Sequence, residues 1–373
     1  MTTTRRQVLA GAVGLGVLAA CKPVASPGTP KEKVLVKHAN GMGVVDAGTG
    51  KWVIEPGPAV LPVDHGGLAV LRDSQLSIWS LASHERSALS KVEGEWKPSA
   101  MVGERVALVR RTGKATKIHV AGLDRAFDVP GDIEPEAFSP DGSKLYVLDH
   151  QPDSYRVRLL DLRTGELQRL NIRGKGVVPA EAEEIMRGHY RQAVWDARRG
   201  ILFSLYAHGG DHQHTGQLLG VRPDAPGIHA FIHALHLAEG WAMCIDLPSP
   251  FGESPIEAHA LALSNNLCAV NAAAGAVAEI DLEGLHLLSV KRFTGSAGDA
   301  FAHGYPLLVG AGARLTDLSA DWQLDAPLSG LASGADGLLW TALGERLVAL
   351  DWPARRRAHE IAVPGLRSVI KTV

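Results

Sequence analysis

AFSPDGSKLYVLD, residues 137–149, contains two apolar strand segments on either side of a tight turn, Ser139-Pro140-Asp141-Gly142. Proline presets the backbone dihedrals of such a turn, and Asp-Gly tolerates its left-handed position. LLDLRTGEL, residues 159–167, then adds a third strand, a polar turn with a glycine, and the start of a fourth strand. This stretch therefore predicts one antiparallel unit of four strands.

Segments with the strand-turn-strand pattern of 159–167 recur along the chain. Clear copies are GVVDAGTGKWVIE from Gly43, EIDLEGLHLLSV from Glu279, LTDLSADWQLD from Leu315 and ALDWPARRRAHEIAV from Ala349; SIWSLASHERSALS, KIHVAGLDRAFDV and ALHLAEGWAMCID are weaker. Their alignment makes eight positions equivalent: Asp46, Ser80, Ala121, Asp161, His236, Asp281, Asp317 and Asp351. The spacing is 34 to 45 residues apart from one interval of 75, which marks a unit with insertions. A period near 40 with this content predicts a β-propeller.

The number and closure of the blades follow from the same copies. Eight copies predict an all-β propeller of eight four-stranded blades over residues 33–373, with seven blades as the alternative. The second strand of each unit is apolar almost throughout, as in ILFSLYA, which is typical of strands buried on both faces. The first unit lacks an innermost strand, and LRSVIKTV, residues 366–373, is expected to supply it and close the ring.

Two of the copies carry a family resemblance. VVDAGTGKWV, residues 44–53, resembles a quinoprotein-type propeller repeat, and the 137–167 stretch resembles the YVTN/WD40-like repeats of bacterial extracytoplasmic proteins. This resemblance implies the propeller fold for most of residues 33–373. It carries over no catalytic residue, because propellers host many unrelated activities and the chain has no adjacent cysteine pair of the kind found in quinone-dependent dehydrogenases.

The N-terminus, MTTTRRQVLAGAVGLGVLAAC, resembles an export signal. Arg5 and Arg6 precede an uncharged run of 13 residues, Val8–Ala20, in the manner of a twin-arginine signal peptide. That run is too short to span a bilayer. Leu18 to Cys21 resembles a bacterial lipobox, which implies cleavage after residue 20 and lipidation of Cys21; an uncleaved anchor or a chance match is the alternative. Residues 21–32, rich in Pro, Ser and Gly, are expected to form a flexible tether.

These features predict a compartment and exclude some partners. The chain is expected on the outer face of the bacterial cytoplasmic membrane or in the periplasm, held to the membrane through the lipid on Cys21. Its other partner would be an extracytoplasmic protein or a small ligand. With 38 basic and 40 acidic residues, the chain has no basic field that would attract nucleic acid. Cys244 and Cys268 lie in apolar strands and are expected to be buried thiols rather than a disulfide.

The one functional lead in the sequence is AHGGDHQHTG, residues 207–216. This segment is expected to be part of an enlarged loop, 207–229, on the top face of blade five, near the connections at 173–190 and 250–259. Imidazole and carboxylate side chains at this spacing could bind a zinc or copper ion, with further ligands from neighbouring loops. The candidate metal ligands are His208, Asp211, His212, His214, His189 and His229. The alternative is a polar loop with no bound ion.

Two functions are therefore open. The favoured one is a binding or scaffold module that needs no cofactor and uses the top-face loops of blades five and six. The alternative is a metal-dependent hydrolase, a lactonase-like propeller enzyme that uses the 208–214 cluster. The sequence contains no nucleophile elbow and no phosphate-binding glycine loop.

Overall fold

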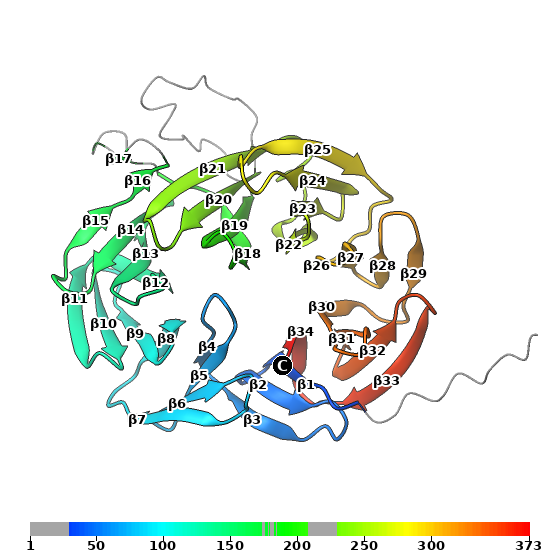
Figure 1. The fold of residues 1–373 in the computed structure, drawn as a ribbon, viewed down its shortest axis with the longest axis horizontal. Coiled ribbons are helices and arrows are strands. Elements are labelled where there is room, and N and C mark those ends of the chain that lie inside the picture. Colours follow the sequence, from blue (N-terminus) through cyan, green and yellow to red (C-terminus); the bar gives the residue numbers. More distant parts are fainter. Residues whose placement is uncertain (1–29, 174–175, 178, 180–182, 184, 208–229) are drawn as a thin grey trace, which may run out of the picture.

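The computed structural model describes residues 30–173, 176–177, 179, 183, 185–207 and 230–373. In these residues eight β-sheets stand side by side around a central channel, as Figure 1 shows. The predicted signal peptide, residues 1–20, and nearly all of the tether lie outside the described residues. No helix in the described part of the chain is long and apolar enough to cross a membrane.

Blades two to four follow one another along the chain, and each is a meander from the channel outward. Blade one combines the first three strands of the chain with the last one. Blade one consists of β34 (Leu366–Thr372), β1 (Lys33–His38), β2 (Gly41–Asp46) and β3 (Trp52–Gly57). Blade two consists of β4 (Ala59–Val60), β5 (Gly67–Arg72), β6 (Gln75–Ser80) and β7 (Arg86–Lys91). Blade three consists of β8 (Lys97–Val102), β9 (Arg105–Arg111), β10 (Ala115–Ala121) and β11 (Arg125–Pro130). Blade four consists of β12 (Asp132–Phe138), β13 (Lys144–Gln151), β14 (Ser154–Asp161) and β15 (Leu167–Arg169).

Blades five to eight complete the ring. Blade five consists of β18 (His189–Asp196), β19 (Ile201–Ala207), β20 (Ala230–His236) and β21 (Trp241–Leu247), with β16 (Asn171–Ile172) and β17 (Gly176–Val177) added at its outer edge. Blade six consists of β22 (His259–Leu263), β23 (Leu267–Asn271), β24 (Ala276–Ile280) and β25 (Leu287–Arg292). Blade seven consists of β26 (Ala300–His303), β27 (Leu308–Ala311), β28 (Arg314–Thr316) and β29 (Asp321–Gln323). Blade eight consists of β30 (Leu328–Ser333), β31 (Leu339–Leu343), β32 (Arg346–Asp351) and β33 (Arg356–Ala362).

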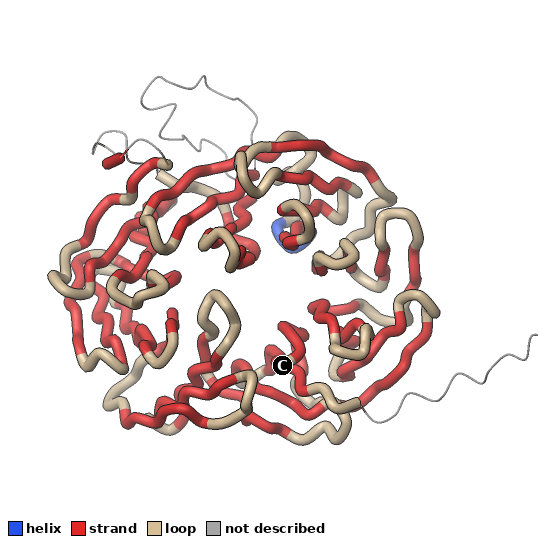
Figure 2. Tube along the Cα trace, in the orientation of Figure 1, coloured by secondary structure: helices blue, strands red, loops and turns tan. Residues whose placement is uncertain are grey.

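The structure confirms eight blades and the closure of the ring by the C-terminal strand. β34 pairs antiparallel with β1, and Val36 lies opposite Val369. Blade one therefore combines both ends of the folded chain, which removes the open edge that a sequential ring would leave. Helical structure is sparse, as expected: Figure 2 shows one short helical segment in the described residues, the 3-10 turn η2 (Ile256–Ala258).

The hydrophobic core lies between the blades. β19 is buried along its whole length, as expected for a second strand, and its side chains face blade four on one side and blade six on the other. Cys244 and Cys268 are buried thiols rather than a disulfide, also as expected. Because each sheet packs between two others, the hydrophobic core is divided among the interfaces between blades. The innermost strands of the blades surround the channel.

The repeated aspartate of the sequence pattern has a structural explanation. Asp161 Oδ1 accepts hydrogen bonds from the backbone N–H groups of Arg163 and Thr164, which closes the turn between the third and fourth strands. At the equivalent positions of the weaker copies, Ser80 Oγ accepts from Ser83 N, and His236 Nδ1 accepts from Glu239 N. Seven of the eight equivalent positions thus carry a side-chain acceptor for this turn, whatever the residue type, and Ala121 of blade three carries none.

Candidate functional site

A cavity of about 1300 Å³ borders the channel between blades four and five. Its walls are the innermost strands β12 and β18, the turn between β13 and β14, and the residues that lead into β18. Residues 61–65 of blade two and Leu263 of blade six complete it. The volume is somewhat above that of a typical small-molecule pocket, and residues of four blades contribute to its lining.

The loop between β4 and β5 projects from blade two into the channel, as Figure 1 shows. Val63 at its tip packs against the hydrophobic cluster between blades four and five. Asp64 Oδ1 accepts a hydrogen bond from Gly66 N, and the His65 carbonyl accepts one from Lys371 Nζ of the closing strand. The loop is thus held by its own turn and by the closing strand, and it forms one wall of the cavity.

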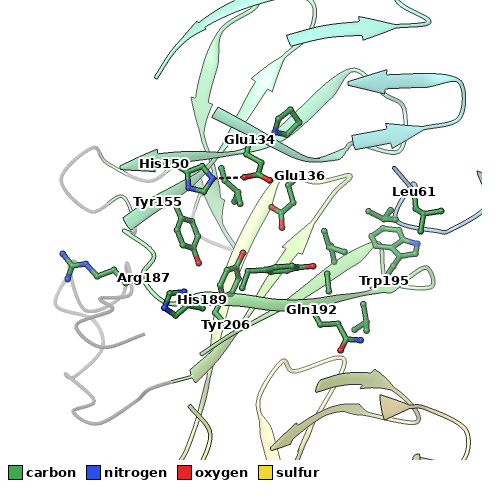
Figure 3. Close-up of a pocket in the computed structure, with 18 of the residues that line it drawn as sticks. Leu61, Glu134, Glu136, His150, Tyr155, Arg187, His189, Gln192, Trp195 and Tyr206 are labelled. Atoms are coloured by element: carbon green, nitrogen blue, oxygen red, sulfur yellow. Dashed lines mark hydrogen bonds and ion pairs between the residues drawn. The ribbon is translucent and has the colours of Figure 1, made fainter. Parts of the chain in front are cut away.

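The central side chain of the cavity, Glu136, is positioned by a β-bulge. The register between β12 and β13 shifts between Pro135 and Ala137, so Glu136 is the extra residue of its strand. Bulges re-aim side chains next to functional sites. Here the carboxyl group points into the space beside Tyr206, as Figure 3 shows.

The same bulge occurs on the innermost strands of blades three and five, where the extra residue joins its blade to the next. Ser99 Oγ donates to the Pro135 carbonyl of blade four. Arg191 Nε donates to the His259 carbonyl of blade six, and Arg191 Nη2 donates to the Ala300 carbonyl of blade seven. Glu136 makes the corresponding contact with blade five only weakly, because Ser204 Oγ donates to its Oε1 at 3.4 Å.

The carboxyl group of Glu136 is consequently buried with little to stabilise its charge. Its second oxygen, Oε2, is buried and has no hydrogen-bond partner among the residues that the structure describes. Burial raises the pKa of Glu136 from its ordinary 4.5 to about 7; the Ser204 hydrogen bond lowers it and the nearby Glu134 raises it further. At neutral pH this group therefore exists in both its protonated and its ionised form.

Glu134, two residues earlier on β12, is in the opposite situation. Its Oε2 accepts hydrogen bonds from Arg111 Nη1 at 2.9 Å and from His150 Nε2 at 3.1 Å, and Figure 3 shows the second of these. The hydrogen bond with His150 holds the pKa of Glu134 below its ordinary value, with Arg111 adding to the effect. Two carboxyl groups on one strand thus differ in that only Glu134 has its charge compensated.

Aromatic rings form the wall that faces Glu136. Tyr206 stacks on Phe231 at 5.1 Å between ring centroids, and Tyr155 and Tyr190 contact the Tyr206 ring at 5.6 and 5.7 Å. Tyr190 remains 53% exposed, so its ring borders the open part of the cavity. Desolvation, with the carboxylate of Glu136 second, raises the pKa of Tyr190 to about 12, and burial raises the pKa of Tyr206 well above its ordinary value, so these two phenols stay protonated.

Five of the six predicted metal ligands, His208, Asp211, His212, His214 and His229, lie outside the described residues. His189 is described: it begins β18, is exposed, and borders the cavity near Tyr155 in Figure 3. Among the described residues no group of three His, Cys, Asp or Glu side chains could hold a metal ion. The metal site thus stays a prediction.

The observed cavity overlaps the predicted contact face of blades five and six, because residues 187–190 at the connection into blade five and Leu263 of blade six line it, but it also extends to blades two and four. At the connection into blade five, Glu183 accepts two hydrogen bonds from Arg158, so it has a structural partner. At the connection into blade six, His259 is buried and its Nε2 accepts from Gly252 N. Sequence reasoning missed Glu136, although DIEPEAF, residues 132–138, places three acidic residues in one innermost strand.

Comparisons with known proteins bear on the fold. No family model matches the sequence, and no curated protein matches it. Among solved structures, the chain is similar to dihydro-heme d1 dehydrogenase NirN in complex with DHE, at 11% identity and a TM-score of 0.55, over 93% of this chain and 77% of that one. It is also similar to apo AztD from Citrobacter koseri, at 12% identity and a TM-score of 0.53, over 92% and 97%. At these identities the likeness establishes the β-propeller fold alone.

Proposed function

We propose that this chain is a lipid-anchored, extracytoplasmic propeller that binds a small ligand in the cavity between blades four and five. The observation that carries the proposal is Glu136, a residue of the cavity lining whose Oε2 is buried and has no hydrogen-bond partner among the described residues. A buried polar atom without a partner costs the fold stability, and it persists where a bound molecule supplies the missing contact. The propeller of NirN, which has a similar shape, was solved with DHE bound.

Residue types around the cavity favour binding over catalysis. Rings supply apolar area, and a few polar groups would orient the ligand. His150 is engaged with Glu134, and the tyrosine hydroxyls stay protonated. The anchor and the export route rest on the resemblance of residues 1–21 to a twin-arginine lipoprotein signal.

A cavity-filling variant tests the binding proposal. Ala193 borders the cavity, and Ala193→Leu would occupy part of it; Ala82→Leu, an exposed turn residue of blade two, is the matched control. Thermal melting of the three proteins would be measured with a panel of organic cations, neutral molecules and anions. Some panel members are expected to raise the melting temperature of wild type and Ala82→Leu, and to lose at least tenfold in affinity for Ala193→Leu. Stabilisation that Ala193→Leu leaves unchanged would place the ligand elsewhere.

Anchoring and export have separate tests in a bacterial host. Cys21→Ser should abolish incorporation of labelled fatty acid and release the chain from the membrane fraction, whereas Arg5→Lys with Arg6→Lys should retain it inside the cell. A labelled Cys21→Ser protein would contradict the lipidation site.

The metal-dependent hydrolase is tested by elemental analysis of the purified chain. Stoichiometric zinc or copper that is lost on replacing His212 and His214 by alanine would favour the hydrolase over the binding module. A metal-free chain whose melting is unmoved by either ion would exclude it.

A further inference from the structure

We propose that the ligand of the cavity is an organic cation whose charged group lies against Glu136, between the carboxylate and the tyrosine rings. This assignment rests on the proposed function and names the chemistry of the ligand. It follows from the charges that border the cavity, from its aromatic wall, and from the hydrogen bonds that the neighbouring Arg191 makes with other blades.

Charged side chains that border the cavity are mostly acidic. The described lining contains Asp64, Glu134, Glu136 and Asp153, against Arg187 as the one side chain that is cationic at every physiological pH. Figure 3 shows Arg187 extending away from Glu136. An anionic ligand would therefore enter a field of its own sign, whereas a cation would be attracted.

The four acidic residues differ in how their charge is stabilised. Glu134 is held by Arg111 and His150, and Asp64 accepts a hydrogen bond from the backbone of its own loop. The nearest candidate counter-ion for Glu136 on β18 is Arg191, but its guanidinium donates to the carbonyls of His259 and Ala300 in blades six and seven. Asp64 and Asp153 are exposed to solvent, so Glu136 is the acidic residue of the lining that has a buried oxygen and no cationic partner in the described part of the chain.

The aromatic wall selects the kind of cation. Ring faces attract ammonium groups through the ring quadrupole, and a carboxylate flanked by rings is the arrangement that recognises alkylated ammonium ions. A metal ion instead requires several oxygen, nitrogen or sulfur ligands, and no such group of three exists in the described residues. The single carboxylate and the rings of Tyr190 and Tyr206 thus favour an organic ammonium over a metal.

Calorimetric titration with defined probes tests the assignment. The probes are tetramethylammonium, choline and benzyltrimethylammonium, each compared with the uncharged molecule in which carbon replaces the nitrogen. Titrations at pH 8.5 keep Glu136 ionised. At least one cation is expected to bind the full chain at least tenfold more tightly than its uncharged counterpart.

Two variants locate the charge, and one serves as control. Glu136→Gln keeps the shape of the side chain and should weaken binding of the cation at least tenfold, with little effect on the uncharged molecule. Tyr190→Leu removes an exposed ring face and should weaken binding of the cation about fivefold. Glu85→Gln, the same change at an exposed turn of blade two, should leave the affinity unaltered.

The possible outcomes separate the two proposals. Cations that bind with equal affinity to wild type and Glu136→Gln, or no better than their uncharged counterparts, would overturn the cation assignment. If no cation binds but neutral or anionic molecules do, and Ala193→Leu blocks them, the assignment is wrong and the binding function stands. If no molecule of any charge binds in the cavity, both proposals are overturned.

Discussion

Glu136 differs from its counterparts on the neighbouring innermost strands in one respect. Ser99 and Arg191 occupy equivalent bulges, and their side chains donate hydrogen bonds to the next blade. Glu136 Oε2, in contrast, has no hydrogen-bond partner among the described residues. A carboxyl group in this position costs stability whenever it is ionised. This cost should therefore be measurable in the free energy of unfolding of the whole ring.

A pH dependence of unfolding follows from the raised pKa of Glu136. Between pH 4.5 and about 7 the folded chain keeps a proton that the unfolded chain has lost, so this group contributes stability at low pH that disappears as the pH rises through 7. We therefore compare the free energy of unfolding of Glu136→Gln with that of wild type. The difference should shift in favour of Glu136→Gln by up to about 3 kcal/mol as the pH rises from 4.5 to 8. Chemical unfolding of both proteins across this range measures the difference.

The other ionisable groups around the cavity are the same in both proteins, so the comparison isolates the change at residue 136. These groups are Glu134 on the same strand, His150 and Tyr155 across blade four, and His189, Tyr190 and Tyr206 on blade five. Glu85→Gln serves again as the control, and its stability relative to wild type should not vary with pH. A constant difference between Glu136→Gln and wild type would show that Glu136 ionises at its ordinary pKa.

At the scale of the strand, contact with the closing strand depends on glycine. Gly330, at the bulge of β30, has φ of +79° and a Cβ there would lie 1.9 Å from the Val369 carbonyl oxygen of β34. Gly337, in the next turn, has φ of +78° and open space around it. The two positions share their backbone strain and differ in whether a neighbour is in the way.

This pair of glycines gives a matched prediction. Gly337→Ala should cost about 1 kcal/mol, since only the backbone conformation opposes it. Gly330→Ala should cost at least about 2 kcal/mol more, because β34 must shift to make room. Equal losses in chemical unfolding would mean that β34 is not packed against β30.

The repeat could be predicted from the sequence because the residues that define it act locally. Turn residues such as Ser139 to Gly142, and the side-chain acceptor at the end of most third strands, act within a few residues. Their spacing therefore marks the blades even where Ser80 or His236 replaces aspartate. Glu136 was not readable in this way. Its role depends on a one-residue bulge and on rings from Tyr190 and Tyr206, which the chain brings together only after two blades have packed.

At the scale of the whole molecule, the ring is one cooperative unit closed by β34. Leu366 and Val369 of this strand are buried, and β34 is the innermost strand of blade one. Without it, β1 becomes an exposed edge and the cluster between blades one and eight loses two members. Closure is therefore expected to stabilise all eight blades rather than its own alone.

Truncation tests this closure. Removal of residues 366–373 should lower the melting temperature of the entire domain by more than about 10 °C, or prevent folding. Thermal melting followed by far-ultraviolet circular dichroism measures the change, and replacement of the exposed Arg367 by alanine is the control. Unchanged melting after truncation would contradict the role of β34.

The closed ring also explains why the cavity faces the channel. The 61–66 loop of blade two projects toward the axis of the ring, and Val63 packs against the cluster between blades four and five. The space between that loop and blades four and five is the cavity with Glu136 at its centre. From the sequence, the number of blades predicts that a channel exists, but the loop that divides it is recognised only in the folded chain.

The most direct test of this account is a crystal structure of the chain grown with benzyltrimethylammonium at saturating concentration. We expect density for the probe in the cavity between blades four and five, with its ammonium group against the Glu136 carboxylate and its methyl groups on the ring of Tyr190. Density for the probe at another site only, or a cavity filled by the chain's own side chains, would contradict it.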